Sequence, residues 1–357
     1  MTSLKSMALP LLPPPFPSGW YVLAQSAEIK PRAVITRRFV GQDLVLFRTE
    51  EGRVVVIDPY CPHMGAHLGR GGKVIGDALR CPMHGFSFNH QGKCVLTPQG
   101  GRPPPAARTR TWPVREQNGL VLVFHDRQGA EPAWEVPVLN DDAFTAPLWE
   151  RLSFRGHPQE TSENSADLLH FAVVHGYQEV TQTHAAADGA EFHTRMTFRR
   201  RDFLGGSRTI PIEISVHVHG LGFSYVDAFV PKWGLKTRQF VLSTPTEADR
   251  VELRIGMAIG RDLRPAKVNP LLALMPLSMV LWIIGRVSMI SYVRDVRQDV
   301  PLWENKAYVN PPALSEKDGP IGQYRRWARQ FYGAGAQVSP LRAANAEDDN
   351  AGMIRSA

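Results

Sequence analysis

The sequence predicts an α+β protein of two domains, with short antiparallel strands in the N-terminal domain and an antiparallel sheet plus helices in the C-terminal domain. Short β-prone runs separated by turn residues fill the first third of the chain. Strand-like runs with period-two alternation follow in the second half, and apolar runs of helical length begin at Pro270. A chain of 357 residues is long enough to form two hydrophobic cores.

The N-terminal elements can be read in order along the chain. Turn residues such as Gly52 and Gly92 separate the runs, and 100–105 is a loop by composition. We therefore expect a small antiparallel sandwich over 18–127. Before it, 1–17 is too rich in proline for a secretion signal and is expected to form an extended arm. The expected strands are 19–24, 43–48, 54–58, 94–96 and 119–124.

Two Cys/His pairs form the strongest motif of this domain. Cys61 and His63 make the first pair, Cys81 and His84 the second, with seventeen residues between His63 and Cys81. Two thiolates and two imidazoles are the ligands of a Rieske [2Fe–2S] cluster, although structural zinc accepts the same donors. Glycines after both pairs, such as Gly85, let the backbone approach bridging sulfides, which favours the cluster over zinc.

A second motif, at 163–175, suits a mononuclear iron. Two histidines and one carboxylate form the facial triad that binds Fe(II) and leaves positions for O₂ and substrate. Asp167 and His170 are three residues apart and would share one side of a helix. His170 and His175 are five apart, about 140° round a helix, so both can bind one metal only if the helix ends or bulges between them. Gly176 is a candidate helix stop.

These two motifs resemble those of Rieske non-haem iron oxygenases. The segments 159–164, 303–306 and 316–332 are similar to the branch that contains the 3-ketosteroid 9α-hydroxylases and the Neverland-type cholesterol 7-desaturases, and the resemblance covers most of 18–332. It implies a helix-grip-like catalytic domain at 137–332. The strands expected in that domain are 213–218, 222–226, 239–243 and 251–255.

The resemblance also implies roles for single residues. Asp299, followed by Trp303, is similar to the segment that supplies the third iron ligand, and Asp295 stays as the alternative. Asp167 matches a residue that hydrogen-bonds a Rieske histidine on one side and an iron-ligating histidine on the other; the residue pattern alone also allows a carboxylate that orients His170. Asn164 is expected near the iron, with a solvent-facing position as the alternative.

The implied cofactors are a Rieske [2Fe–2S] cluster and a mononuclear Fe(II). Electrons would come from NAD(P)H through a ferredoxin or ferredoxin reductase, and would pass from His63 or His84 to an iron held in a neighbouring subunit of a homotrimer. The expected reaction uses O₂ to hydroxylate or desaturate a large apolar substrate, a sterol or steroid. An arylamine oxygenase of the aminopyrrolnitrin type, a Rieske electron carrier without oxygenase activity and a zinc-stabilised binding module remain alternatives.

Composition narrows the remaining choices. Three cysteines exclude a disulfide framework and favour a reducing, cytoplasmic compartment; Cys94 is expected to pack as a small apolar residue. The net charge of +7 is spread along the chain, which argues against nucleic acid and leaves docking of an acidic electron-transfer protein open. Residues 270–285 are too short to span a bilayer, so we expect a buried helix or one lying at a membrane surface. A disordered tail is expected over 333–357.

Overall fold

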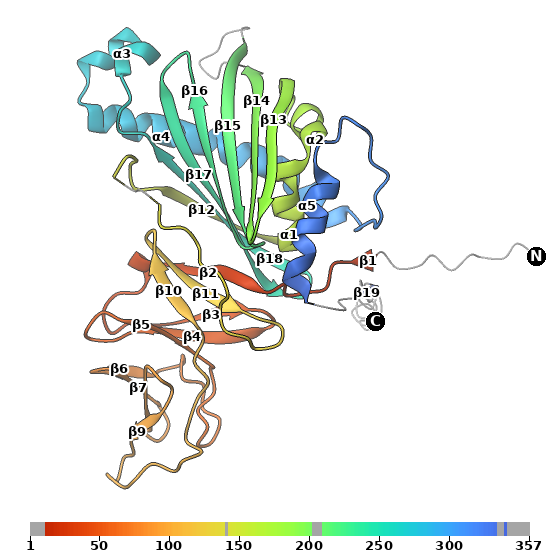
Figure 1. The fold of residues 1–357 in the computed structure, drawn as a ribbon. Coiled ribbons are helices and arrows are strands. Elements are labelled where there is room, and N and C mark those ends of the chain that lie inside the picture. The colour runs from red at the N-terminus through yellow and green to blue at the C-terminus, as the bar shows by residue number, and fades with distance from the viewer. Residues whose placement is uncertain (1–10, 140–141, 202–208, 334–338, 341–357) are drawn as a thin grey trace, which may run out of the picture.

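The computed structural model describes residues 11–139, 142–201, 209–333 and 339–340. Two bodies are stacked along one axis: a small N-terminal β domain, and a larger domain in which helices cover one face of a single wide sheet (Figure 1). The arrangement is the α+β class expected from the sequence.

Three small antiparallel sheets build the N-terminal domain. Their orders are β10–β11–β2, β3–β4–β5 and β6–β7–β8–β9. The fully buried faces of β2 and β11 come from the apolar runs that begin with Trp20 and Leu120. The strands are β2 (Gly19–Gln25), β3 (Val34–Phe39), β4 (Gln42–Arg48), β5 (Val54–Ile57), β6 (Lys73–Ile75), β7 (Ala78–Arg80), β8 (Ser87–Asn89), β9 (Cys94–Leu96), β10 (Val114–Gln117) and β11 (Leu120–His125), with a short 3₁₀ helix at Ser26–Glu28.

A seven-stranded antiparallel sheet forms the centre of the C-terminal domain, in the order β12–β18–β17–β16–β15–β14–β13. Alternate residues on these strands point to opposite sides of the sheet. Helices cover the first face, and the second face contacts the N-terminal domain or solvent. On that second face, Phe223 and Phe240 pack against Trp20 and Leu122 of the N-terminal domain. The strands are β12 (Leu148–Arg155), β13 (Gln178–Asp188), β14 (Glu191–Arg201), β15 (Thr209–His219), β16 (Phe223–Val230), β17 (Leu235–Glu247) and β18 (Arg250–Ile259).

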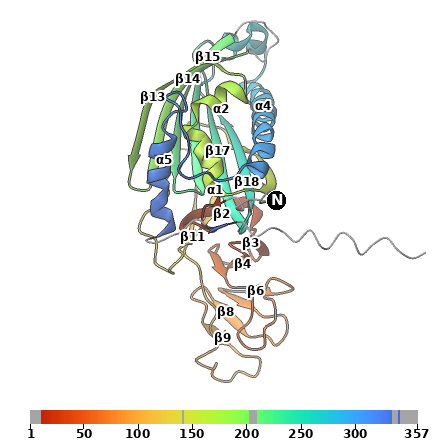
Figure 2. The same cartoon turned by 90° about the vertical axis from the view of Figure 1, so that its right-hand side faces the viewer.

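Helices cover the first face of this sheet (Figure 2). The long helix α4 packs on β12 and β18 through residues such as Val280 and Ile284, and α5 packs on β14 through Trp327. The helices are α1 (Pro158–Glu163), α2 (Leu168–Val173), α3 (Pro265–Val268), α4 (Leu277–Asn305) and α5 (Ile321–Ala328), with 3₁₀ turns at Asn164–Ala166, Pro270–Leu274 and Arg329–Tyr332.

The apolar segment 270–285 differs from its expected form. It does not make one helix interrupted at Pro276: a 3₁₀ turn ends at Leu274, Pro276 occupies the N-cap position, and α4 continues past Arg286 to Asn305. Proline suits a helix start because its missing N–H would be unpaired there. Of the two expected positions, buried or at a membrane surface, the first describes only one side: Val280 and Ile284 are buried, whereas Leu274 is 84% and Trp282 59% exposed. Apolar composition alone does not distinguish a core face from an exposed one.

A two-residue strand near each end of the described chain completes the fold. Strand β1 (Leu11–Leu12) pairs antiparallel with β19 (Ser339–Pro340), which lies within the segment expected to be a disordered tail. Of the expected arm, 1–10 lie outside the described residues, and so do 334–338 and 341–357 of the expected tail.

Candidate active site

An elongated cavity lies between the covered face of the seven-stranded sheet and the helices α2 and α4. Its walls are mostly aliphatic side chains from the central strands. Two charged residues of the wall, Arg200 and Asp295, pair with each other at 3.1 Å, so they leave no net charge between them. Such a cavity favours an apolar ligand, with few polar groups to orient it. Representative wall residues are Ile212, Ile214, Val226, Val241, Leu253 and Met257.

The segment around α2 brings two histidines to the end of this cavity. The spacing of Asp167 and His170 predicted that both lie on one face of a helix, but Asp167 precedes α2 and caps it. Its Oδ1 accepts a hydrogen bond from the His170 backbone N–H at 3.0 Å. The helix ends at Val173, and Gly176 has a φ of +68°, a conformation that glycine adopts without strain. The expected helix end between His170 and His175 is therefore confirmed.

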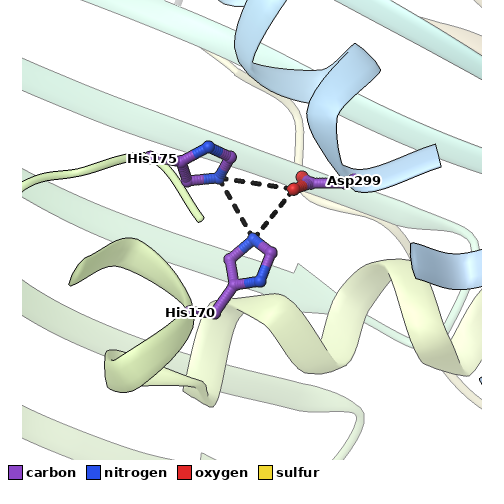
Figure 3. Close-up of side chains that lie close together, drawn as sticks. All are labelled: His170, His175 and Asp299. Atoms are coloured by element: carbon purple, nitrogen blue, oxygen red, sulfur yellow. Dashed lines mark hydrogen bonds and ion pairs between the residues drawn. The ribbon is translucent and has the colours of Figure 1, made fainter. Parts of the chain in front are cut away.

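Asp299 completes a compact group with these two imidazoles (Figure 3). The Nε2 atoms of His170 and His175 lie 3.1 Å apart, and Asp299 Oδ1 lies 3.0 Å and 3.5 Å from them. All three side chains are less than a tenth exposed. Asp299 Oδ1 is buried and has no hydrogen-bond partner, which is costly unless a cation occupies the space between the three groups. Two imidazoles and one carboxylate that converge in this way fit a mononuclear iron.

Two amide side chains border this group. Asn164 lies in the cavity wall, not in solvent, with Nδ2 at 3.3 Å from His170 Nε2 and 3.4 Å from Asp299 Oδ2. Gln298 Oε1 lies 3.1 Å from His175 Nδ1, so a proton on Nδ1 would leave Nε2 available to a metal. No sequence pattern pointed to Gln298 beyond its place next to Asp299.

Asp295 lies one helical turn before Asp299 and has other partners. It accepts a hydrogen bond from Tyr177 Oη at 2.9 Å as well as its ion pair with Arg200. Burial, with the Asp295 charge adding to it, raises the pKa of Tyr177, so the phenol stays protonated and donates this bond. The structure thus places Asp299, and not Asp295, beside the two histidines.

Helix α1 ends at Glu163, directly before Asn164, and its contacts to neighbouring segments hold Asn164 in place. Arg325 of α5 donates to both carboxylate oxygens of Glu163, each at 2.7 Å, and both side chains are largely buried. Glu160 lies beside Lys306, and burial raises the pKa of Glu160.

The two Cys/His pairs lie at the opposite end of the molecule, on the loops beside β6 and β7 (Figure 1). The loops have the same form: the N–H groups of Gly65 and Gly85 donate to the carbonyls of Cys61 and Cys81, at 2.8 Å and 3.1 Å. Both cysteines are buried and free of disulfides. The rings of His63 and His84 lie 4.8 Å apart between centroids. This arrangement fits a [2Fe–2S] cluster, with the thiols inside and the imidazoles outside.

Two sequence families match the chain. The Rieske [2Fe–2S] domain matches residues 19–113, and the C-terminal domain of 3-ketosteroid 9α-hydroxylase matches residues 123–332, more than half of the chain. The chain belongs to the 3-ketosteroid 9α-hydroxylase family of Rieske oxygenases. The resemblance inferred from the sequence motifs is confirmed.

Several proteins are similar to this family member over nearly its whole length. A cholesterol 7-desaturase of Ciona intestinalis is 30% identical over 95% of this chain and 73% of its own length. The oxygenase component of a 3-ketosteroid-9-alpha-monooxygenase of Rhodococcus rhodochrous is 31% identical over 90% of this chain and 82% of its own. Dicamba monooxygenase, with 19% identity and a TM-score of 0.67 over 88% of this chain and 96% of its own, shares the fold.

This Rieske oxygenase is therefore an oxidoreductase of the monooxygenase and desaturase type. Its cofactors are a Rieske [2Fe–2S] cluster and a mononuclear non-haem iron, and its electrons come from a ferredoxin or reductase partner. The two alternatives from other classes, an electron carrier without oxygenase activity and a zinc-stabilised binding module, are thereby excluded.

Proposed function

We propose that this protein hydroxylates or desaturates a sterol or steroid at an iron held by His170, His175 and Asp299. The convergence of these three side chains at the end of an apolar cavity carries the proposal. The bound iron would supply the activation of O₂ with electrons relayed from a cluster held by Cys61, Cys81 and the two Rieske imidazoles.

The protein's own residues would hold and orient the substrate. The walls are mostly aliphatic, and Arg200 and Asp295 neutralise each other. Transfer of a rigid apolar molecule from water into this cavity would therefore lower its free energy. Thr237 and Gln239 are polar groups on the same wall and would orient a hydroxyl or keto group of the substrate. Asn164 would act beside the iron through its contacts to His170 and Asp299.

The substrate class is tested by product analysis. The enzyme, reconstituted with ferredoxin, reductase and NAD(P)H, is incubated with a panel of sterols and 3-ketosteroids, and with arylamines as the competing class. Mass spectrometry should detect a gain of one oxygen or a loss of two hydrogens in a steroid. Conversion of arylamines without conversion of any steroid would reject the sterol assignment and leave the oxygenase assignment standing.

We further infer that electrons pass between subunits of a homotrimer, with residues 18–127 as the electron-accepting domain and 137–332 as the catalytic domain. Within one chain the loops that carry the Cys/His pairs and the helix α2 lie at opposite ends (Figures 1 and 2), which favours transfer between chains over transfer within one chain. Asp167 lies at the start of α2 and is only half-buried, so a neighbouring Rieske histidine can reach it.

We also infer that the enzyme docks on anionic membranes through the segment 264–290, from which it would take its substrate. By length and composition α4 could cross a bilayer, but a core helix of a soluble protein passes the same test, and its Val280 and Ile284 pack on the sheet. Its outer side is apolar and is flanked by exposed cations, as in helices that lie on a bilayer surface. The exposed apolar residues are Leu271, Leu274, Leu277, Met279, Trp282 and Ile290, and the cations are Arg264, Lys267 and Arg286.

Vesicle flotation tests this membrane contact. The wild type should float with phosphatidylserine-containing vesicles, and Trp282→Glu should reduce the floating fraction several-fold. Leu314→Glu, which changes an exposed apolar residue on another surface, serves as the matched control and should float like the wild type. Equal flotation of the wild type and Trp282→Glu would reject the docking surface.

A further inference from the structure

A second group of potential metal ligands lies on the opposite face of the catalytic sheet. Val216 of β15 faces the substrate cavity. Side chains alternate between the two faces of a strand, so His217 and His219 both lie on the face that points away from the cavity. Strand pairing places Glu191 of β14 directly opposite His219, and His193 directly opposite His217. The four side chains therefore share one patch that does not belong to the iron site.

The donor atoms in this patch are close together and partly unsatisfied. One ligand atom each from Glu191, His217 and His219 lies within 4.8 Å of the other two. His217 Nδ1 is 2.9 Å from Glu191 Oε1. The side chain of His219 is 93% buried (relative exposure 7%), and its Nε2 has no hydrogen-bond partner. The ring of His193 stacks on that of His217 at 4.4 Å, and its Nε2 is also buried and unpartnered.

We propose that Glu191, His217 and His219 bind a divalent first-row cation of the Zn²⁺ class, with His193 beside it as a further donor. Imidazole and carboxylate are the donors that Zn²⁺ accepts, and tetrahedral bonds of about 2.1 Å require donor atoms about 3.4 Å apart. The histidines are fixed by the sheet, whereas the Glu191 side chain is 37% exposed and can move the remaining distance.

The protonation states agree with this geometry. Burial lowers the pKa of His219 to about 4 and that of His193 also to about 4, so both rings are neutral at pH 7. Neutral imidazole is the form that binds metal. The charges that act on the patch are the Glu191 carboxylate, which attracts a cation, and Arg195, which lies beside His193.

The position of the patch indicates a structural role for the cation. The Gly220 N–H already donates to the Ala190 carbonyl at 2.9 Å, which joins the β13–β14 and β15–β16 turns. His219 stacks on Tyr225, which packs against the N-terminal domain. A bound cation would cross-link the two turns where the catalytic sheet meets that domain, and would raise the unfolding temperature.

The test is equilibrium dialysis of the tag-free, full-length holoenzyme against Zn²⁺, with elemental analysis of both zinc and iron. The wild type should retain one equivalent of zinc with its iron content unchanged, and zinc should raise its unfolding temperature. Glu191→Gln, which preserves the side-chain shape, and His217→Ala should each raise the Kd for zinc at least tenfold. His90→Ala, which disrupts a comparable surface pair with Asp77, is the control and should bind zinc like the wild type.

Three results would overturn the proposal. They are the absence of zinc binding by the iron-loaded wild type, zinc binding that neither Glu191→Gln nor His217→Ala weakens, and loss of the zinc equivalent in Asp299→Ala. The last result would place the zinc in the iron site.

Discussion

At the scale of single residues, the choice between two aspartates on α4 depends on their partners. Asp295 is neutralised by Arg200 and accepts a hydrogen bond from Tyr177, whereas Asp299 faces two imidazoles with one oxygen unpartnered. A buried carboxylate in that state is stabilised by a metal, while one in an ion pair is already satisfied.

We therefore predict that Asp299→Ala lowers the iron content from about three atoms per chain to about two, because the two-iron cluster would remain. Asp295→Ala, one turn away on the same helix, should retain all three. Elemental analysis together with the visible spectrum of the cluster measures both. The opposite pattern would assign the third ligand to Asp295.

The local parts of the site could be predicted from the sequence, and the distant contacts could not. His170 and His175 were predicted as ligands because their segment resembles the iron motif of Rieske oxygenases, and Gly176 predicted the helix end that both need to face one metal. Asp299 came from a resemblance and not from spacing. The Gln298–His175 contact spans 123 positions and depends on how α4 docks on the sheet, which a sequence pattern does not encode.

At the scale of elements, α1 is capped by His157, whose protonation couples the stability of the fold to pH. His157 Nδ1 accepts from the Gln159 N–H at 3.1 Å, and its Nε2 lies 3.2 Å from the Pro14 carbonyl. Burial lowers the pKa of His157 to about 4, below the value near 6.5 of an unfolded chain. Between these values the unfolded state binds more protons, so stability falls as the pH falls through this window.

We predict that lowering the pH from 7 to 4.5 costs the wild type about 2 kcal/mol through His157 alone. His157→Asn keeps a side-chain oxygen for the Gln159 N–H but cannot be protonated, so its stability should decline less over the same range. Urea unfolding at several pH values measures the difference in slope. Parallel pH profiles for the two proteins would contradict the prediction; His125, whose pKa burial also lowers to about 4, contributes equally to both.

Strands were easier to predict from the sequence than the buried and exposed faces of the helices. The alternation in 213–218 lies inside β15, and the run 251–255 lies inside β18. The segment 270–285 was misjudged because its apolar residues cover both a core face and an exposed face, and only the docking of α4 on β12 and β18 separates the two.

At the scale of the whole molecule, the proposed transfer of electrons between chains can be tested at Asp167. Asp167→Asn should keep the α2 cap, since asparagine is as good an N-cap as aspartate, and should therefore keep the fold and both metal centres. The lost charge should reduce turnover more than tenfold if Asp167 connects the centres. Steady-state turnover, metal content and the mass of the assembly are measured together. Turnover near the wild-type rate in an intact assembly would remove Asp167 from the electron path.

Helix α4 joins the exposed Trp282 to Asp299 in one rigid rod. The two residues are seventeen positions apart, which corresponds to about 25 Å along a helix that rises about 1.5 Å per residue. An interfacial helix enters a bilayer by only about 5–10 Å. If the segment 264–290 lies along a bilayer surface, this length of helix runs parallel to the surface and sets the lateral distance between the contact at Trp282 and the iron site. A substrate taken up at Trp282 must therefore leave the bilayer and travel through the protein before it reaches the iron.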